Sequence, residues 1–275
     1  MLMRIMRSWR LRWALKEIVS TSNFSNHKQI LYTPLKYRLA LLLKLIPRLW
    51  TAPIKLRLKN GGIFYVKDFM TLYIFKEIFV DHSYDYPKMH TDQPIIIDVG
   101  ANAGLFSIRM KQLYPNSFIY CYEPFSSNYE QLKRNLEQSH FSGYELFVKG
   151  VGGTARKEKL FIHHKNSGGH SINQGLTDGN DYVEIELADI QSVLNNVAGK
   201  RCNLLKLDCE GAEYEIIKSL DEETAQRIES IIFENTPGQY ELKELIKHLD
   251  SIGYQIGSHE DPRLVIASQR PRFSQ

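Results

Sequence analysis

The chain has 275 residues, of which 43% are hydrophobic, so it can hold one sizeable domain with an appendage, and global disorder is excluded. The three cysteines are widely spaced without a C-x-x-C pair, which argues against a disulfide framework or a structural zinc site and favours reduced thiols. The net charge of +4 is uneven: residues 1–60 carry thirteen Lys or Arg and one acid, Glu17, whereas residues 61–275 carry 22 Lys or Arg and 30 acids. The basic character therefore belongs to the N-terminal segment.

Residues 1–50 are expected to form two helical stretches separated by a polar loop from Ser20 to Lys28. The second stretch has apolar residues at helical spacing among lysines and arginines, namely Leu35, Leu39, Leu42, Leu43 and Ile46. No run of about 18 apolar residues is free of charge, so no transmembrane helix is predicted. No secretory signal is predicted either, because the segment has no clean apolar core and no small-residue cleavage site. Two interpretations stay open: a helix that packs on the main domain or covers its active site, and a basic amphipathic helix on an anionic membrane surface. Nucleic-acid binding is not predicted, because no recognisable RNA- or DNA-binding fold accompanies the basic residues.

Residues 54–93 are expected to lead into the main domain as a hairpin and a helix. Asn60-Gly61-Gly62 separates two apolar runs, residues 54–58 and 63–66, which is typical of a hairpin. Residues 71–80 keep one apolar helical face. The chain is thus divided into a basic helical extension (1–53), this connecting part (54–93) and a main domain (94–270).

From Pro94 onward, strand-like and helix-like segments alternate, which predicts an α/β fold with a mostly parallel sheet and crossover helices. The expected strands are 94–99, 118–123, 144–149, 158–163, 182–187, 203–208, 230–235, 254–258 and 263–268. Helices are expected near 104–113 and 127–138, from Asp189 to about Asn196, after Gly211-Ala212, and along the apolar stripe from Leu242 to Ile252.

The first expected strand of the main domain ends in an acid and a glycine turn, Asp98-Val99-Gly100-Ala101-Asn102-Ala103-Gly104. A second strand ends in another acid, Glu123, nineteen positions past Gly104. Two acids at the carboxyl ends of adjacent strands, one of them beside a glycine turn, suit a nucleoside ligand with a ribose diol. The turn lacks G-x-G-x-x-G, which argues against an NAD-dependent oxidoreductase, and no Gly-Lys-Ser/Thr follows to make a P-loop. S-adenosyl-L-methionine fits better, with its amino-acid end over the turn and its ribose at Glu123.

Two further acids, Asp208 and Glu234, end later strands and are expected at the same edge of the sheet. If a methyl group is transferred to a hydroxyl, a base must remove the proton, and the candidates are His170 in a glycine-rich loop, Asp208 and Glu234. No metal is predicted. Asp208, Glu210, Glu213 and Glu234 supply oxygens, but a hard cation requires several ligands that converge, and spacing does not demonstrate convergence.

With these residues laid out, the chain resembles the FkbM family of S-adenosylmethionine-dependent methyltransferases over roughly residues 94–268. Four segments carry the likeness: Ile97 to Gly104, with Asn102 in place of a middle glycine; Tyr122-Glu123-Pro124 with Asn128 and Leu132 to Asn135; Leu205 to Glu213; and Ile232-Phe233-Glu234. The chain departs from many relatives after Glu234, where Asn235 and Thr236 stand instead of a histidine two positions on. A base role at such a histidine does not carry over.

The resemblance implies a seven-stranded class I methyltransferase fold, Rossmann-like, whose last strand is antiparallel. It also implies that Asp98, Gly100, Asn102 and Gly104 surround the methionine part of the cofactor and that Glu123 binds the ribose hydroxyls. By the same analogy, Val151 and Gly152 lie near the adenine.

The expected function is S-adenosylmethionine-dependent methylation, on oxygen of a sugar, a glycan or a related hydroxyl-bearing small molecule. The expected location is the cytoplasm, with peripheral membrane contact through residues 1–50 as an open alternative. A different class of function is a non-catalytic module that keeps the fold and serves as a membrane-associated scaffold. The basic N-terminal segment motivates that alternative.

Overall fold

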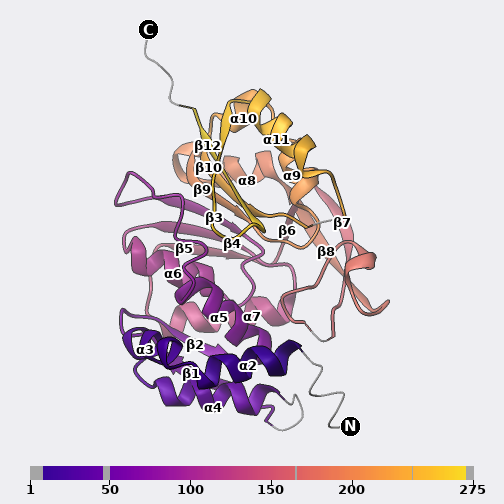
Figure 1. Ribbon diagram of the computed structural model, residues 1–275. Helices are drawn as coiled ribbons and strands as arrows, with labels where there is room; N and C mark the ends of the chain where they lie inside the picture. The colour runs from indigo at the N-terminus through magenta and orange to yellow at the C-terminus, as the bar shows by residue number, and fades with distance from the viewer. Residues whose placement is uncertain (1–8, 46–49, 165, 237, 271–275) are drawn as a thin grey trace. The chain divides into compact units, whose positions relative to one another are not determined.

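The computed structural model describes residues 9–45, 50–164, 166–236 and 238–270 (Figure 1). The chain forms two compact units, one of residues 1–82 and 134–141 and one of residues 83–133 and 142–275. Helix α7 (Ser126–Gln138) is divided between them at Lys133. Among the described residues, no helix has both the length and the apolar character needed to cross a membrane.

The first unit begins with three helices, α2 (Trp9–Val19), α3 (Thr21–Ile30) and α4 (Pro34–Leu45). The predicted polar loop from Ser20 to Lys28 is therefore wrong, because most of it is α3. The Ser20 hydroxyl caps this helix by accepting a hydrogen bond from the Asn23 backbone N–H at 3.2 Å. His27 is fully buried and lies 2.9 Å from the Glu17 carboxylate. Helix α3, which has few apolar residues, is thus held by the buried contact between His27 and Glu17. The spacing of apolar residues in the sequence does not reveal such a contact. Ile46, predicted to continue the stripe of α4, lies outside the described residues.

The rest of the first unit is the predicted hairpin, β1 (Ile54–Arg57) and β2 (Ile63–Val66), and helix α5 (Phe69–Phe79). Ile54 pairs with Val66, and the turn residues Gly61 and Gly62 both have positive φ. The Phe64 ring stacks on the Phe75 ring and the Tyr37 ring is tilted against it, each with a centroid distance of 5.1 Å, and all three side chains are buried. The end of α7 belongs here because the Tyr65 N–H donates to the buried Asn135 side chain at 3.1 Å.

The second unit contains a seven-stranded sheet in the order β11-β12-β10-β9-β3-β4-β5. Its strands are β3 (Ile95–Val99), β4 (Phe118–Tyr122), β5 (Tyr144–Phe147), β9 (Cys202–Leu207), β10 (Ile228–Glu234), β11 (Tyr254–Gly257) and β12 (Leu264–Gln269). The central pairs are parallel, whereas β12 runs antiparallel to both β10 and β11. The predicted fold class is confirmed, including the antiparallel last strand.

Helices α6 (Leu105–Leu113), α8 (Ile190–Asn196), α9 (Glu213–Lys218), α10 (Glu222–Ala225) and α11 (Leu242–Ser251) accompany the sheet (Figure 1). Ile190, Ile216 and Leu245, from three of these helices, are buried in one apolar cluster with Leu205 of β9. Strand β3 pairs with β4 on one side and with β9 on the other. The strands that follow β3 in the chain are therefore added first on one side of it and later on the other, which reverses the strand order at β3. Ligands of open α/β sheets bind at the carboxyl ends of the strands beside such a reversal.

A smaller sheet in the order β6-β8-β7 accounts for the remaining strands. The predicted strand 144–149 is wrong in extent: β5 ends at Phe147, and β6 (Gly150–Gly152) pairs with β8 (Tyr182–Asp189) instead. The predicted strand 158–163 is shifted to β7 (Arg156–Phe161). Val151 and Gly152 therefore lie in a separate sheet.

Candidate active site

The turn after β3 is built so that only glycine fits at its first position. Gly100 has φ +75°, and a Cβ atom there would lie 1.8 Å from the carbonyl oxygen of Asp208. The N–H groups of Gly100 and Ala101 both donate to the carbonyl oxygen of Tyr122, at 3.0 and 3.1 Å. The turn is thus held against β4 on one side and against the end of β9 on the other.

Asn102 and Glu123, predicted to bind the same ligand, are in direct contact. The Asn102 N–H donates to Oε2 of Glu123 at 2.8 Å, and the Phe125 N–H donates to Oε1 at 2.9 Å. Asn102 has φ +49°, and Gly104 has φ +80° and begins α6. Glu123 is only 5% exposed, and burial raises the pKa of its carboxyl to about 7. The structure therefore places an acid with an unusually high pKa directly beside the glycine turn.

Asp98 is enclosed beneath this turn with no exposed surface. Its Oδ2 accepts a hydrogen bond from the Ser107 hydroxyl at 2.7 Å, and its Oδ1 lies 3.1 Å from Nζ of Lys206. The same ammonium donates to the carbonyl oxygen of Gly100 at 2.8 Å. Burial alone would lower the pKa of Lys206, but the charges of Asp98 and Asp208 outweigh it and raise this pKa. Asp98 thus acts on the turn through Lys206, with its own carboxylate enclosed.

Sequence reasoning did not identify Lys206 as a site residue. The signal was present, because a lysine inside the apolar strand Asn203-Leu204-Leu205-Lys206-Leu207 must find a buried partner of opposite charge. An acid on a neighbouring strand supplies it, and only the pairing of Asp98 with Lys206 across β3 and β9 reveals which acid.

Asp208 follows β9 and is about a third exposed, at 32%. Its Oδ2 lies 3.4 Å from Lys206 Nζ and accepts a hydrogen bond of 3.4 Å from the Tyr84 hydroxyl. The Tyr84 ring packs edge-on against Phe106, with centroids 5.7 Å apart. Asp208 is therefore a partly accessible carboxylate with a fixed hydroxyl beside it.

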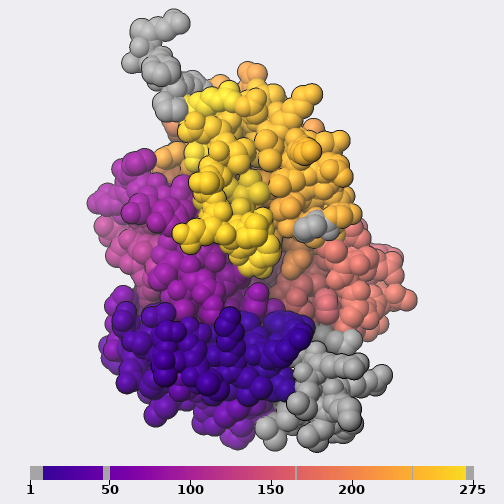
Figure 2. Space-filling view, viewed as in Figure 1, coloured from indigo at the N-terminus to yellow at the C-terminus, as the bar shows by residue number. Residues whose placement is uncertain are grey.

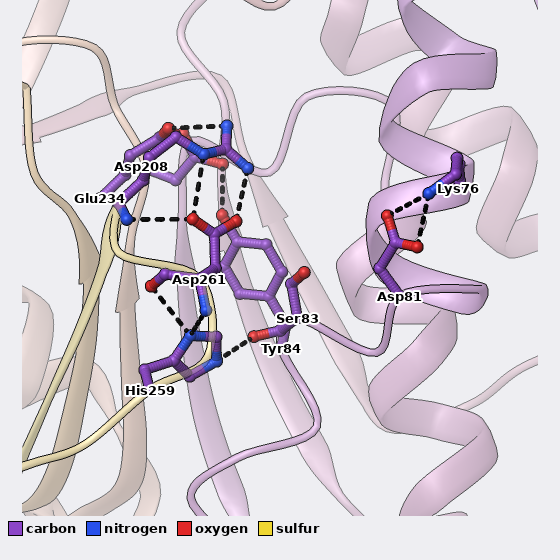
Figure 3. Close-up of polar contacts among 9 residues, drawn as sticks. Lys76, Asp81, Ser83, Tyr84, Asp208, Glu234, His259 and Asp261 are labelled. Carbon is purple, nitrogen blue, oxygen red and sulfur yellow. Dashed lines mark hydrogen bonds and ion pairs between the residues drawn. The ribbon is translucent and has the colours of Figure 1, made fainter. Parts of the chain in front are cut away.

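Glu234 ends β10 and faces a guanidinium (Figure 3). Its Oε1 lies 3.2 Å from Nη1 of Arg263, whose Nη2 lies 2.6 Å from Asp261. In the same loop, Nδ1 of His259 accepts from the Asp261 N–H at 2.9 Å, so its Nε2–H donates to the Ser83 carbonyl oxygen, also at 2.9 Å. The β11–β12 loop thereby holds the segment that carries Tyr84. Sequence reasoning missed these residues because they lie far apart along the chain.

His170 lies on the β4 side of the site. Its Nδ1 accepts from the His163 N–H at 3.0 Å, and its ring centroid is 4.3 Å from that of Phe125. The loop that carries His170 is anchored at two points. The Asn128 amide donates to the Ser167 carbonyl oxygen at 3.0 Å, and the Ser171 hydroxyl donates to the carbonyl oxygen of Glu210. The loop therefore connects the end of β4 with the end of β9.

Two further acids, Glu210 and Glu213, follow Asp208 after β9. Glu213 is 1% exposed and accepts from the N–H groups of Cys209 and Gly211 at 2.7 and 2.8 Å. Burial, together with the charges of Asp208 and Glu213, raises the pKa of Glu210 to about 8. Across the described ranges, no cluster of three or more His, Cys, Asp or Glu side chains has the arrangement of a metal site.

The β6 residues predicted to lie near the adenine, Val151 and Gly152, are both buried. Val151 pairs with Ala188 of β8, and a Cβ atom at Gly152 would lie 2.6 Å from Oε1 of Glu215. Their contact with an adenine stays a prediction.

The strand order, the antiparallel last strand and the glycine turn at the reversal define the class I methyltransferase fold. Comparison with known proteins makes the assignment specific: a family model described as the methyltransferase FkbM domain matches residues 98–256. The chain belongs to the FkbM methyltransferase family, which confirms the resemblance seen in the sequence.

Individual relatives agree with this membership. Methyltransferase sdnD of Sordaria araneosa is 32% identical over 191 residues, which cover 59% of this chain and 73% of that protein. Methyltransferase 1 of Beauveria bassiana is 28% identical over 202 residues, covering 67% of this chain and 81% of that protein. The 31-O-demethyl-FK506 methyltransferase FkbM of Streptomyces tacrolimicus is 22% identical over 237 residues, which cover 75% of this chain and 91% of that protein.

Proposed function

We propose that this protein is an S-adenosyl-L-methionine-dependent methyltransferase that methylates an oxygen of a sugar, a glycan or a related hydroxyl-bearing small molecule. The observation that carries the proposal is the contact between the Asn102 N–H and the Glu123 carboxylate, which joins the glycine turn to a buried acid. Support for oxygen as the acceptor atom comes from the Streptomyces relative, whose name specifies a 31-O-demethyl substrate.

The residues present fit this cofactor. Each Glu123 oxygen accepts one backbone N–H and keeps a lone pair that can accept a ribose hydroxyl. Gly100 and Asn102 are both partly exposed and both have positive φ, so the backbone of the turn can meet the methionine part of the cofactor at these two residues. Val151 and Gly152 line the adenine end by analogy with the family. The cofactor supplies an activated methyl group on a sulfonium, and the protein aligns the acceptor and excludes water.

An acceptor hydroxyl must lose its proton as the new O–C bond forms, and Asp208 is the residue placed best to orient or accept it. It is partly exposed, it lies next to the Tyr84 hydroxyl, and its backbone adjoins the turn. Glu234 is held by Arg263. In His170, Nδ1 accepts a backbone N–H, so the neutral ring carries its proton on Nε2 and presents a donor there. Asp208 therefore ranks above Glu234 and His170.

Methyl transfer to a matched panel of hydroxyl and amine acceptors tests the proposal. We expect wild-type protein to form S-adenosylhomocysteine only with hydroxyl acceptors, and Asp208→Asn to lower kcat by about a hundredfold or more. Glu234→Gln, which removes a charge at another partly exposed strand-end acid, is the matched control and is expected to retain more activity. Methylation of amines alone would contradict the acceptor class, and an unchanged kcat in Asp208→Asn would remove that residue from the mechanism. Folded protein that transfers no methyl group would favour the scaffold alternative.

A further inference from the structure

Helices α2 and α4, with Tyr32 and Trp50 near their ends, expose an unusual number of large apolar side chains. Among the described residues, fourteen large hydrophobic side chains are exposed, and eight of them lie between residues 9 and 50: Trp9, Leu15, Val19, Tyr32, Leu35, Leu39, Leu42 and Trp50. These helices form one continuous block, drawn in indigo in Figure 2. Single exposed apolar residues are ordinary on protein surfaces, but a concentration of this kind marks an interaction surface.

Helix α4 is apolar on two sides. Tyr37, Ala40 and Leu41 are fully buried in the unit's core. Leu35, Leu39 and Leu42, spaced by four and three residues, remain 69%, 53% and 50% exposed. Among the described residues, the helix thus has a second apolar stripe that stays at least half exposed.

Helix α2, which contacts α4, has a mixed exposed face. Leu15 and Val19 are 48% and 74% exposed, and the exposed side chains of Arg12 and Lys16 lie at helical spacing between and beside them. Basic and apolar residues therefore alternate around the same exposed stripe, as they do in helices that lie in the plane of a membrane interface.

The exposed charged side chains of this N-terminal segment are all positive. Glu17 is the single acid among residues 1–60, and it is 2% exposed and 2.9 Å from the buried ring of His27. The exposed lysines Lys16, Lys28 and Lys36 have no exposed acid among these residues to offset them. The surface is complementary to a partner that is both apolar and negatively charged.

We propose that this surface, formed by the exposed residues of α2 and α4 with Tyr32 and Trp50, docks on an anionic lipid bilayer. Its leucines enter the headgroup–acyl boundary, its lysines and arginines meet the anionic headgroups, and its half-exposed Trp9, Trp50 and Tyr32 suit the interface between apolar and aqueous phases. A second copy of this chain fits less well, because it brings surfaces of the same positive sign together. The inference does not depend on the proposed methyl transfer.

Flotation of the full chain with vesicles tests this docking. One set of vesicles is phosphatidylcholine, and the other contains roughly a quarter phosphatidylserine. We expect wild-type protein to float with the anionic vesicles, and raised salt to weaken the binding because it screens the charge attraction. The triple variant Leu35→Ser/Leu39→Ser/Leu42→Ser is expected to bind about tenfold or more weakly.

Two further variants separate lost docking from lost folding. The matched control Leu113→Ser/Val148→Ser/Ile256→Ser removes three apolar side chains that are 37%, 50% and 37% exposed outside this surface, and it is expected to bind as wild type does. Lys16→Glu/Lys36→Glu is expected to lose most binding to anionic vesicles and to keep its fold by circular dichroism. Absent flotation of wild type, or equal loss in the control, would overturn the proposal. So would a dimer abolished by the leucine substitutions in a chain that ignores vesicles, since that result assigns the surface to a second copy.

Discussion

Replacing Gly100 by alanine is expected to lower the free energy of unfolding by about 2–5 kcal/mol. Two effects combine at this position. The φ of +75° is unfavourable for any residue with a side chain, and the added Cβ would lie 1.8 Å from the Asp208 carbonyl oxygen, a backbone atom that cannot rotate away. Urea denaturation followed by circular dichroism measures the change.

Gly199→Ala is the matched control for this substitution. Gly199 has φ +68°, and no atom lies within 4 Å of its added Cβ, so it carries the conformational penalty without the clash. A loss of about 1 kcal/mol is expected there. An equal loss of unfolding free energy at Gly100 and Gly199 would show that the close approach of Gly100 to the Asp208 carbonyl oxygen adds no penalty to that of the backbone conformation.

Replacing Lys206 by methionine is expected to destabilise the protein by about 3–5 kcal/mol, because it leaves the Asp98 carboxylate buried without a counter-charge. Lys206 is 3% exposed, Asp98 has no exposed surface, and the two charged groups are 3.1 Å apart. The loss also removes the hydrogen bond from Lys206 to the Gly100 carbonyl oxygen. Denaturation at neutral pH measures the effect.

A double-mutant cycle isolates the ion pair. Lys206→Met combined with Asp98→Asn should cost clearly less than the sum of the two single substitutions, because the double variant buries no unpaired charge. Lys243→Met on α11, at an exposed lysine, is the matched control and is expected to change stability by less than about 0.5 kcal/mol. Strict additivity of Lys206→Met and Asp98→Asn would contradict a direct interaction.

Much of the sheet was predictable because its information is local. Mostly apolar runs ending in Asp98, Glu123, Asp208 or Glu234 mark both the strand and its carboxyl end, and the structure places these acids at the ends of β3, β4, β9 and β10. The glycine turn could also be predicted, since few backbone conformations connect a strand to a helix through a short run of small residues. The contact between Asn102 and Glu123 then follows from the parallel pairing of β3 and β4.

What escaped prediction depends on partners that are distant in sequence. Helix α3 has little apolar periodicity and is stabilised by the buried pair of Glu17 and His27. The interaction of Asp98 with Lys206 joins two strands, and that of Glu234 with Arg263 joins the end of β10 to the β11–β12 loop. Such pairings are set by the order of strands in the sheet, which composition and spacing along one chain do not specify.

Isothermal titration with S-adenosyl-L-methionine tests directly whether the glycine turn and Glu123 bind this cofactor. We expect saturable binding that tightens up to about tenfold between about pH 6 and about pH 8, because burial raises the pKa of Glu123 to about 7 and only the ionised carboxylate accepts both ribose hydroxyls. Glu123→Gln should bind weakly and lose this pH dependence, whereas Glu145→Gln, at an exposed acid of β5, should behave as wild type. Absence of binding to folded wild-type protein would show that the site does not bind this cofactor, and unchanged affinity in Glu123→Gln would show that Glu123 does not bind its ribose.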